Sequence, residues 1–406
     1  MTAGPAVPRL HGVDDGSLPD FMRAFDLTFG QIGTPERVDR LRAWIELDRL
    51  VAASVSGQVV ATSGAFSFEM SLPFASSAPC AGITLVSVRA DQRRRGLLTR
   101  MMGSLLDDAS ERGEPLAALW ASEAPIYGRF GFGPAAPTLN LEIERAVRFR
   151  TEGPVEDVVL VDRADAGSAF PALYEAARRT RPGTMGRSDG WWRRELDDPD
   201  DRREGAGEKR YALLPGRGYA TYRLRAGWGA GVPDGTVEVL DLVTLDGVAN
   251  AALWRFVIDT DLSVRTRAGR RPVDDPLLVS VTDPARLHAG HDWPLQLRLV
   301  DLPRALTSRG YRVDDTLVLG VHDAFRPANQ GTWRLVVEGG VATCEPTDGP
   351  ADLELDIATL GAVFLGGQRT TTFAAAGQVT APDRSAPARL DRLMAADVAP
   401  WHGGMF

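Results

Sequence analysis

Residues 86–98 decide how this sequence is interpreted, and they read Val86-Ser87-Val88-Arg89-Ala90-Asp91-Gln92-Arg93-Arg94-Arg95-Gly96-Leu97-Leu98. The apolar residues up to Val88 predict a β-strand. From Gly96 onward the apolar residues recur at helical spacing, which predicts a helix that ends at Arg112-Gly113. A strand that runs through a short arginine-glycine turn into a helix is therefore the starting point for the fold.

The turn at residues 92–96 predicts an anion site. Unpaired backbone N–H groups point out of a helix N-terminus, where they favour a bound phosphate. Gly96 lets the backbone approach a pyrophosphate closely, and the arginines can pair with phosphate oxygens. The stretch favours a nucleotide-bearing cofactor, although a solvated basic turn before an amphipathic helix would give a similar pattern.

The neighbouring residues alternate between predicted helices and strands. Helical spacing from Phe21 to Leu50 predicts two helices, with Thr34 as an N-cap before Pro35. Ser122 is expected to cap a short helix that carries Tyr127. The predicted strands of this first part are residues 50–55, 59–65, 82–88 and 116–120.

Residues 155–294 follow a similar order of predicted elements, and we predict a degenerate duplication of the first part. Strands are expected at 211–214, 218–223 and 237–243, followed by a helix at 248–258. Residues 244–247, Thr-Leu-Asp-Gly, stand where the first copy has its arginine-glycine turn. A final section from residue 295 contains a predicted hairpin around Gly339-Gly340 and closing helices. The expected fold class is mixed α/β, of the α+β type.

Length, charge and cysteine content exclude several classes of protein. A chain of 406 residues favours two or three domains. A formal net charge of −8 argues against nucleic acid as a partner and favours a cationic acceptor. Residues 1–10 lack a secretory pattern, and no apolar stretch approaches bilayer length, so a cytoplasmic protein without a membrane span is expected. Cys80 and Cys344 have no motif spacing, and the scattered histidines predict no metal site.

The turn also resembles a known family. The GNAT superfamily of N-acetyltransferases carries Gln or Arg, two residues, Gly, one residue, then Gly or Ala, and Arg93, Gly96 and Leu98 occupy these places. Leu98 departs from the small last residue but agrees with the Eis (enhanced intracellular survival) branch. Residues 93–98 and 121–134 together resemble Eis. The resemblance implies a GNAT domain at 1–150, a degenerate GNAT-like domain at 151–294 and a sterol-carrier-protein-like domain at 295–406.

The Eis resemblance further implies that acetyl-CoA is the acyl donor. The backbone of residues 86–88 would pair with the pantetheine arm as an added strand does. Residues 94–99 would hold the pyrophosphate, and Ser122 and Glu123 would line the far side. The donor-binding residues expected in this way are Val86, Ser87, Val88, Arg93, Arg94, Arg95, Gly96, Leu97, Leu98, Thr99, Ser122 and Glu123.

Two residues are expected to carry the chemistry. A phenol of pKa near 10 stays protonated at neutral pH, so Tyr127 can give a proton to a departing thiolate. The alternative is that Tyr127 simply packs beside Phe130 and Phe132. By the resemblance, the carboxylate of the terminal Phe406 helps to remove the proton of the amine. A carboxyl of pKa about 3.3–3.7 would act through water or by orienting the cation, and His402 is a competing base.

The Eis resemblance implies a primary amine as the acceptor: an aminoglycoside, a polyamine or a lysine-like amine. Met405 stands where some relatives have an acid, which predicts weak aminoglycoside activity. Residues near Phe25, Asp26, Phe29 and Gln31 could form one wall of the acceptor pocket. The resemblance implies a homo-oligomer, usually a hexamer. The alternative function is a lipid- or small-molecule-binding carrier whose acetyltransferase domain is vestigial.

Overall fold

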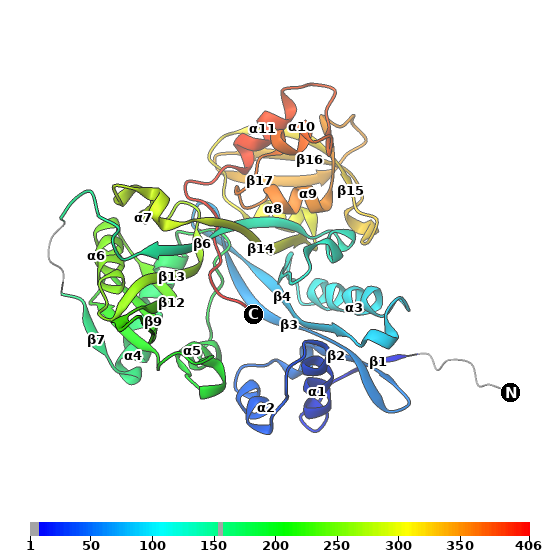
Figure 1. The fold of residues 1–406 in the computed structure, drawn as a ribbon. Helices are drawn as coiled ribbons and strands as arrows, with labels where there is room; N and C mark the ends of the chain where they lie inside the picture. The colour runs from blue at the N-terminus through cyan, green and yellow to red at the C-terminus, as the bar shows by residue number, and fades with distance from the viewer. Residues whose placement is uncertain (1–7, 153–156) are drawn as a thin grey trace.

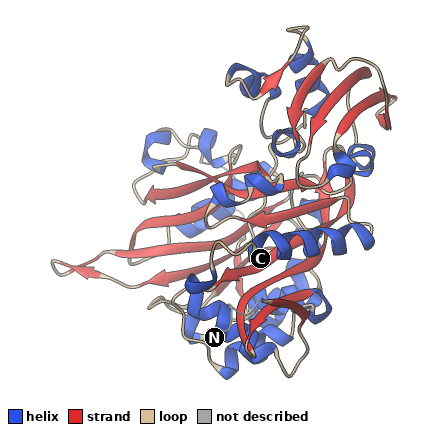
Figure 2. Cartoon of the chain, turned by 90° about the vertical axis from the view of Figure 1, so that its right-hand side faces the viewer, coloured by secondary structure: helices blue, strands red, loops and turns tan. Residues whose placement is uncertain are grey.

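A computed structural model describes residues 8–152 and 157–406. Residues 1–7 of the N-terminal segment, and residues 155 and 156 at the start of the expected second copy, lie outside the described residues. A twelve-stranded sheet runs through most of the chain, in the order β1-β2-β3-β4-β5-β14-β6-β13-β12-β9-β8-β7. A five-stranded sheet, in the order β17-β16-β15-β18-β19, belongs to the C-terminal part and stands apart from the large sheet (Figures 1 and 2). The mixed α/β fold class is confirmed.

The first unit contains the strands β1–β6 and the helices that pack on them. Helix α3 covers one face of β3, β4 and β5 with its apolar side. Thr34 accepts a hydrogen bond from the Arg37 N–H and caps α2, as predicted. The bounds are β1 Arg9–Gly12, α1 Leu18–Thr28, α2 Pro35–Arg42, η1 Leu47–Arg49, β2 Leu50–Val55, β3 Gln58–Leu72, β4 Ser76–Val88, η2 Ala90–Gln92, α3 Leu97–Glu111, β5 Leu116–Trp120, η3 Ala124–Ile126, η4 Gly128–Phe130 and β6 Gly133–Glu144.

Two predictions for the first unit need correction. Strands β3 and β4 form a hairpin far longer than the expected 59–65 and 82–88, because both continue through residues that are not β-branched and yet lie in the core. Ser122 caps no helix. The chain forms two short 3₁₀ turns there, with Glu123 at the first N-cap position, without a side-chain cap, and Tyr127 between the turns.

The second unit repeats the order of elements of the first. Helix α6 packs on β12 and β9 as α3 packs on β4 and β3. The bounds are β7 Val159–Val161, α4 Arg163–Arg178, α5 Asp189–Leu196, η5 Asp200–Arg202, β8 Arg210–Leu214, β9 Gly218–Arg225, β10 Trp228–Gly229, β11 Val232–Pro233, β12 Gly235–Thr244, α6 Gly247–Ile258, β13 Ser263–Pro272, α7 Leu277–Ser280, η6 Pro284–Leu287 and β14 Gly290–Leu299.

The two units exchange their last strands. β6 follows β5 in the chain but pairs antiparallel with β13 of the second unit. β14 follows β13 but pairs antiparallel with β5 of the first unit. β14 also pairs with β6, so the two exchanged strands join the half-sheets into one. The expected domain limit at residue 294 therefore falls inside β14, and the limits 1–150, 151–294 and 295–406 stay predictions.

The third unit contacts strand β14 of the second unit through a buried ion pair. Arg298 on β14 contacts Asp323 at 2.5 Å, and both side chains are almost fully buried. The bounds of this unit are α8 Leu302–Ser308, β15 Asp315–His322, η7 Pro327–Asn329, β16 Gly331–Glu338, β17 Val341–Pro346, β18 Leu353–Asp356, α9 Ile357–Val363, α10 Thr370–Ala375, β19 Val379–Thr380 and α11 Ala386–Met394. Among the described helices of the whole chain, none is long and apolar enough to cross a membrane. Cys80 and Cys344 are free and buried.

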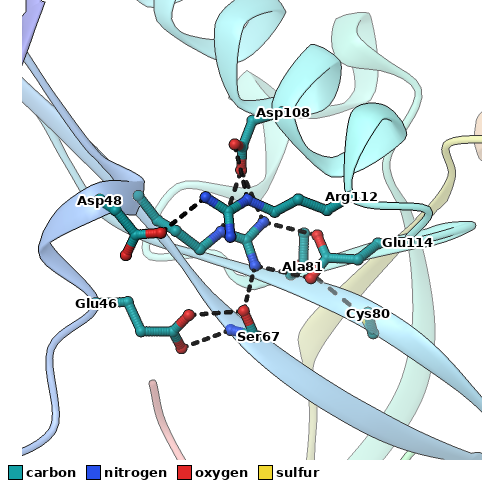
Figure 3. A network of polar contacts seen from close by, with 9 residues as sticks. Glu46, Asp48, Ser67, Cys80, Ala81, Asp108, Arg112 and Glu114 are labelled. Atoms are coloured by element: carbon teal, nitrogen blue, oxygen red, sulfur yellow. Dashed lines mark hydrogen bonds and ion pairs between the residues drawn. The ribbon is translucent and has the colours of Figure 1, made fainter.

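A second buried ion pair holds helix α3 against the sheet of the first unit. The Arg49 guanidinium donates to both Glu114 carboxylate oxygens at 2.7 and 2.6 Å, to Asp108 at 3.1 Å and to Ser67 at 2.8 Å. Figure 3 shows the partners converging from the sheet, from α3 and from the segment after α3. The Arg49 side chain is fully buried, so its charge depends on these partners.

We predict that Arg49→Met lowers the stability of the first unit by about 3–5 kcal/mol, because it leaves the Glu114 carboxylate buried without its partner. Arg112→Met is the matched control. Arg112 pairs with Asp48 and Asp108 at 2.8 and 2.9 Å but is partly exposed, so its loss should cost less than about 1 kcal/mol. Differential scanning calorimetry measures both changes. Equal shifts in melting temperature would contradict the importance of the buried pair.

Candidate active site

Strands β4 and β5 separate at one end of the first unit, and we call the point where their pairing ends the parting of β4 and β5. They pair in parallel from Cys80 with Leu116 to Ile83 with Leu119 and no further. β5 ends at Trp120, whereas β4 continues to Val88 and stays paired with β3 on its other side. The edge of β4 that faces β5 is therefore unpaired beyond Ile83, and its backbone can pair with an extended ligand.

A bulge in β4 lies at this parting. The register with β3 shifts between the pairs Gly64–Thr84 and Thr62–Ser87, and Leu85 has a left-handed φ of 52°. The Thr62 hydroxyl donates to the Leu85 carbonyl at 2.7 Å and lies 2.8 Å from the Ser87 hydroxyl, which fixes the bulge. Bulges bend a strand and redirect its side chains. The bulge therefore changes the direction of residues 86–88 relative to residues 80–83, the part of β4 that pairs with β5.

The turn that follows β4 has the geometry of an anion site. Gly96 is the N-cap of α3, with φ of 72° and no side-chain cap, so the first N–H groups of the helix lack a partner from a capping side chain. Arg94 is also left-handed, with φ of 62°. Arg93, Arg94 and Arg95 are exposed, and within residues 8–152 and 157–406 none of them forms an ion pair. Three uncompensated positive charges thus stand beside the helix N-terminus.

A cavity of about 660 Å³ joins the parted strand to this turn. Every residue that the resemblance assigned to the donor lines it except Arg95, which is exposed outside the lining. Tyr127 also lines it. The remaining lining residues were not predicted as donor-binding: Thr28, Phe29, Gln92, Ile126 and Arg129.

Two of these additional residues had a signal in the sequence. Gln92 belongs to the arginine-glycine turn itself, and its buried side-chain oxygen Oε1 has no hydrogen-bond partner among the described residues. Arg129 follows Tyr127 by two positions. Thr28 and Phe29 come from the end of α1, and no local pattern connects them with the turn. Phe29 was considered for a wall of the acceptor pocket, and it lines this cavity. Asp26, which was considered for an acceptor wall, is instead buried beside Arg37 at 3.1 Å, and burial raises its pKa.

Tyr127 lines the cavity and packs in one cluster with residues of α3. The residue is 8% exposed, and its ring centroid lies 6.3 Å from that of Phe132. Its hydroxyl has no hydrogen-bond partner among the described residues, so it is free to donate to a ligand. Burial, and secondarily the negative charge of Glu123, raise the pKa of Tyr127 above its usual value. The phenol is therefore held in its protonated form at neutral pH.

The C-terminal segment ends between the first and second units (Figure 1). The Phe406 ring lies 5.2 Å from the Phe68 ring, and a Cβ added to Gly82 would come within 3.2 Å of it. Among the described residues, none forms an ion pair with the terminal carboxylate. The C-terminal tail, residues 395–406, therefore packs with its last side chain against the first unit. Its terminal carboxylate is not neutralised by an ion pair with any described residue.

Tyr127 and Phe406 lie on opposite faces of β4. Tyr127 packs in the cluster of Ala81 and Ile83, whereas Phe406 lies against Gly82, whose Cβ direction is the other face. Gly82 and Ile83 are the last residues of β4 that pair with β5, so Tyr127 and Phe406 both lie near the point where the two strands separate. Tyr127 lines the cavity, and Phe406 does not.

The corresponding place in the second unit is built differently. Asp246 caps α6 by accepting from the Ala249 N–H at 2.8 Å, so a carboxylate already lies at this helix N-terminus. A cavity of about 260 Å³ nearby is lined by Arg178, Arg181 and Arg271, each of which is paired with a carboxylate. These arginines of the second unit consequently offer no uncompensated charge for a pyrophosphate.

Comparison with known proteins agrees with this division. Family models described as "Acetyltransferase (GNAT) domain" match residues 9–135 and 183–299, and a model described as "Sterol carrier protein domain" matches residues 302–403. An uncharacterised N-acetyltransferase of Streptomyces coelicolor is 39% identical over 99% of this chain and 100% of its own. The N-acetyltransferase Eis of Mycobacterium tuberculosis is 34% identical over 90% of this chain and 91% of its own.

Solved structures give the same result. Eis1 from Mycobacterium abscessus matches with a TM-score of 0.87 and 30% identity, covering 98% of this chain and 100% of its own. A GCN5-related N-acetyltransferase from Anabaena variabilis matches with a TM-score of 0.84 at 19% identity, covering 98% of this chain and 100% of its own, which bears on the fold alone. The expected order of two GNAT units and a sterol-carrier-like unit is confirmed.

His402 gives the docked tail a predictable pH dependence. Its ring lies 6.1 Å from Trp120 and 5.6 Å from Phe406, and burial together with the charges of Arg187 and Arg270 lowers the pKa of His402 to about 3. Such an imidazole is too weak a base to favour His402 over the terminal carboxylate. In the unfolded chain its pKa is about 6.5.

Because the folded state binds this proton less readily than the unfolded state, the stability is complete above pH about 6.5 and falls as the pH drops toward 3, by at most about 1.4 kcal/mol per unit. We therefore expect the melting temperature of the wild type to fall more between about pH 7.5 and about pH 5 than that of His402→Phe. The same pH dependence in both proteins would contradict the buried, neutral imidazole.

Proposed function

The chain belongs to the Eis family of GNAT N-acetyltransferases, and we propose that it transfers the acetyl group of acetyl-CoA to a primary amine at the parting of β4 and β5. The observation that carries this proposal is the cavity of about 660 Å³, which combines an unpaired strand edge, the arginine-glycine turn and Tyr127. Tyr127, the unpaired strand edge and the arginine-glycine turn suit, in this order, the thioester, the amide-bearing arm and the pyrophosphate of the donor.

The donor is held by groups of the first unit alone. The unpaired backbone of Val86, Ser87 and Val88 pairs with the amides of the pantetheine arm. The N–H groups at the start of α3, with Arg93 and Arg94, bind the pyrophosphate, while Ser122 and Glu123 line the opposite wall. The places of these residues around one cavity support this assignment.

Tyr127 acts as the general acid. The amine nitrogen attacks the thioester carbon, the carbon–sulfur bond breaks, and the leaving thiolate takes the proton of the Tyr127 hydroxyl. The free hydroxyl supports this role, and the raised pKa of Tyr127 keeps the phenol neutral, so it is reprotonated from solvent after each donation.

The Phe406 carboxylate assists the removal of the proton from the amine. Its usual pKa of about 3.3–3.7 makes it a weak base, so it acts through water and by attracting the cationic acceptor. The position of the Phe406 ring at Gly82, across β4 from Tyr127, supports this role. The attack and the departure of the thiolate then take place on opposite sides of the thioester.

The acceptor is a cationic amine of the aminoglycoside, polyamine or lysine-like type. The net charge of −8 supports such an acceptor through long-range attraction. Met405 is half-exposed at the tail and carries no charge, which supports weak binding of strongly cationic aminoglycosides. The hexameric assembly is proposed from the family resemblance alone, and the cytoplasmic location stays a prediction.

The donor assignment predicts a difference among three adjacent arginines. Arg93→Ala and Arg94→Ala should each weaken acetyl-CoA binding by about tenfold, and more at low salt, because each removes a charge from the phosphate site. Arg95→Ala is the matched control, since Arg95 has the same charge but lies outside the cavity. Isothermal titration calorimetry measures the affinities. An equal loss in all three variants would contradict the assignment.

The acid assignment predicts that Tyr127→Phe lowers kcat by about 10²–10⁴-fold with unchanged affinity for acetyl-CoA. Since the pKa of Tyr127 is raised above about 10, the wild-type kcat should show no loss from its ionisation up to that pH. Steady-state kinetics across pH tests both points. If Tyr127 only packs against its neighbours, phenylalanine preserves the packing and kcat stays near that of the wild type.

A further inference from the structure

The second unit also contains a pair of parallel strands that part. β12 and β13 pair from Gly235 with Ser263 to Val239 with Ala268, and no further. Beyond this point β12 pairs only with β9, and β13 only with β6. This is the place that corresponds to the parting of β4 and β5, where the first unit offers an unpaired backbone edge.

The chain's own C-terminal segment lies at this second parting. Trp401 and Gly403 line a small cavity together with residues 239–241 and 269–271, where β12 and β13 separate. The Trp401 indole N–H donates to the Arg270 carbonyl at 2.6 Å. A side chain of the tail thus forms a hydrogen bond with the backbone of β13 just where this strand has separated from β12.

The backbone of Trp401 is bound as well. Its N–H donates to the Pro182 carbonyl at 2.8 Å, and its carbonyl accepts from the Thr184 hydroxyl at 3.1 Å. The Arg271 guanidinium lies 5.5 Å from the indole ring and donates to the Leu242 carbonyl across the parting at 2.9 Å. Trp401 is 9% exposed. It is therefore fixed by hydrogen bonds from its ring and its backbone, and by the packing of its ring.

The tail is also held before and after Trp401. The Ala399 N–H donates to Asp274 at 3.0 Å, and the Ala399 carbonyl accepts from Arg181 at 2.9 Å. The Met405 carbonyl accepts from Arg194 at 3.1 Å. Trp401 is close to the terminal Phe406 in the chain, so fixing Trp401 limits the space that the Phe406 carboxylate can reach.

We propose that the second unit has kept its parted strands as an anchor for Trp401, and that this anchor makes Trp401 the positioning residue that holds the Phe406 carboxylate at the site of the first unit. The proposal rests on the proposed function of Phe406. The proposal gives the degenerate second unit a role. This unit binds the C-terminal tail at the parting of β12 and β13, the place that corresponds to the donor site of the first unit.

The tail offers a matched pair of substitutions for testing the anchor. A Cβ added to Gly403 would lie 2.4 Å from the Trp401 ring, whereas one added to Gly404 would meet its nearest atom, on His402, at an ordinary 3.5 Å. Gly403→Ala should therefore displace the indole or the tail, and Gly404→Ala should not. Trp401→Ala removes the anchor itself, and Trp401→Phe keeps an aromatic ring but removes the hydrogen bond to Arg270.

Release of Phe406 by carboxypeptidase A from the folded full-length protein, followed by mass spectrometry, measures docking of the tail without reference to activity. We expect Trp401→Ala and Gly403→Ala to release Phe406 about tenfold faster than the wild type, with Trp401→Phe between them. Their kcat should fall about tenfold with unchanged acetyl-CoA affinity, because only the placement of the carboxylate changes. Gly404→Ala should match the wild type in all three measurements.

A chain that lacks only Phe406 separates the two claims. If its kcat falls while Trp401→Ala and Gly403→Ala release Phe406 and turn over like the wild type, the anchor is wrong and the role of Phe406 stands. If it keeps its kcat while the two variants release Phe406 faster, the role of Phe406 is wrong and the anchor remains as a docking site. Two results would overturn the positioning role of Trp401. In the first, the Trp401 and Gly403 variants release Phe406 fast but keep their kcat, although the chain that lacks Phe406 has a lowered kcat. In the second, both Trp401 variants lose affinity for acetyl-CoA.

Discussion

The exchange of β6 and β14 is the constraint on which the rest of this structure depends. Strand β6 of the first unit pairs with β13 of the second, and strand β14 of the second unit pairs with β5 of the first. The two exchanged strands also pair with each other where the half-sheets meet. Every exchanged pair is held by backbone hydrogen bonds, so the units cannot move apart without breaking a sheet. The exchange therefore fixes the parting of β4 and β5 relative to that of β12 and β13. The C-terminal tail contacts both, with Trp401 beside β13 and Phe406 beside Gly82 of β4.

Arg298 extends this constraint to the chemistry. It lies on β14, where it contacts Asp323 of the third unit and donates to the Phe130 carbonyl in the turn that follows Tyr127. Next to that carbonyl, Gly131 has a φ of 82°, and a Cβ there would collide with the Arg298 guanidinium. The turn after the proposed acid is thus held by a strand from the second unit and a carboxylate from the third. The second and third parts of the chain therefore support a turn of the first unit that lies next to the cavity.

Local patterns predicted the parts of the site that are continuous in sequence. The strand, turn and helix of residues 86–98 needed only apolar spacing, Gly96 and the charges to be recognised, and the N-cap at Thr34 followed from its neighbours. The length of β3 and β4 was missed because residues such as Ser71, Ser76 and Pro79 are poor strand formers that pairing between the two strands overrides.

Partners that are distant in sequence could not be predicted in this way. The pattern of β14 indicates a strand but not that its neighbour is β5, which lies far earlier in the chain. Likewise an apolar tail indicates docking, but its contact with Arg270 depends on where β13 separates from β12. Thr28 and Phe29 reach the cavity of the first unit only through the packing of α1 on β3 and β4.

The most direct test of acetyl transfer at the first unit is to measure thiol release from acetyl-CoA and N-acetylated product together, with and without a panel of polyamine, lysine-like and aminoglycoside acceptors. The account predicts that thiol release depends on the amine and that one acetylated amine forms for each thiol released. Binding of acetyl-CoA without amine-dependent thiol release, or an absence of binding, would contradict it and favour a carrier with a vestigial acetyltransferase unit.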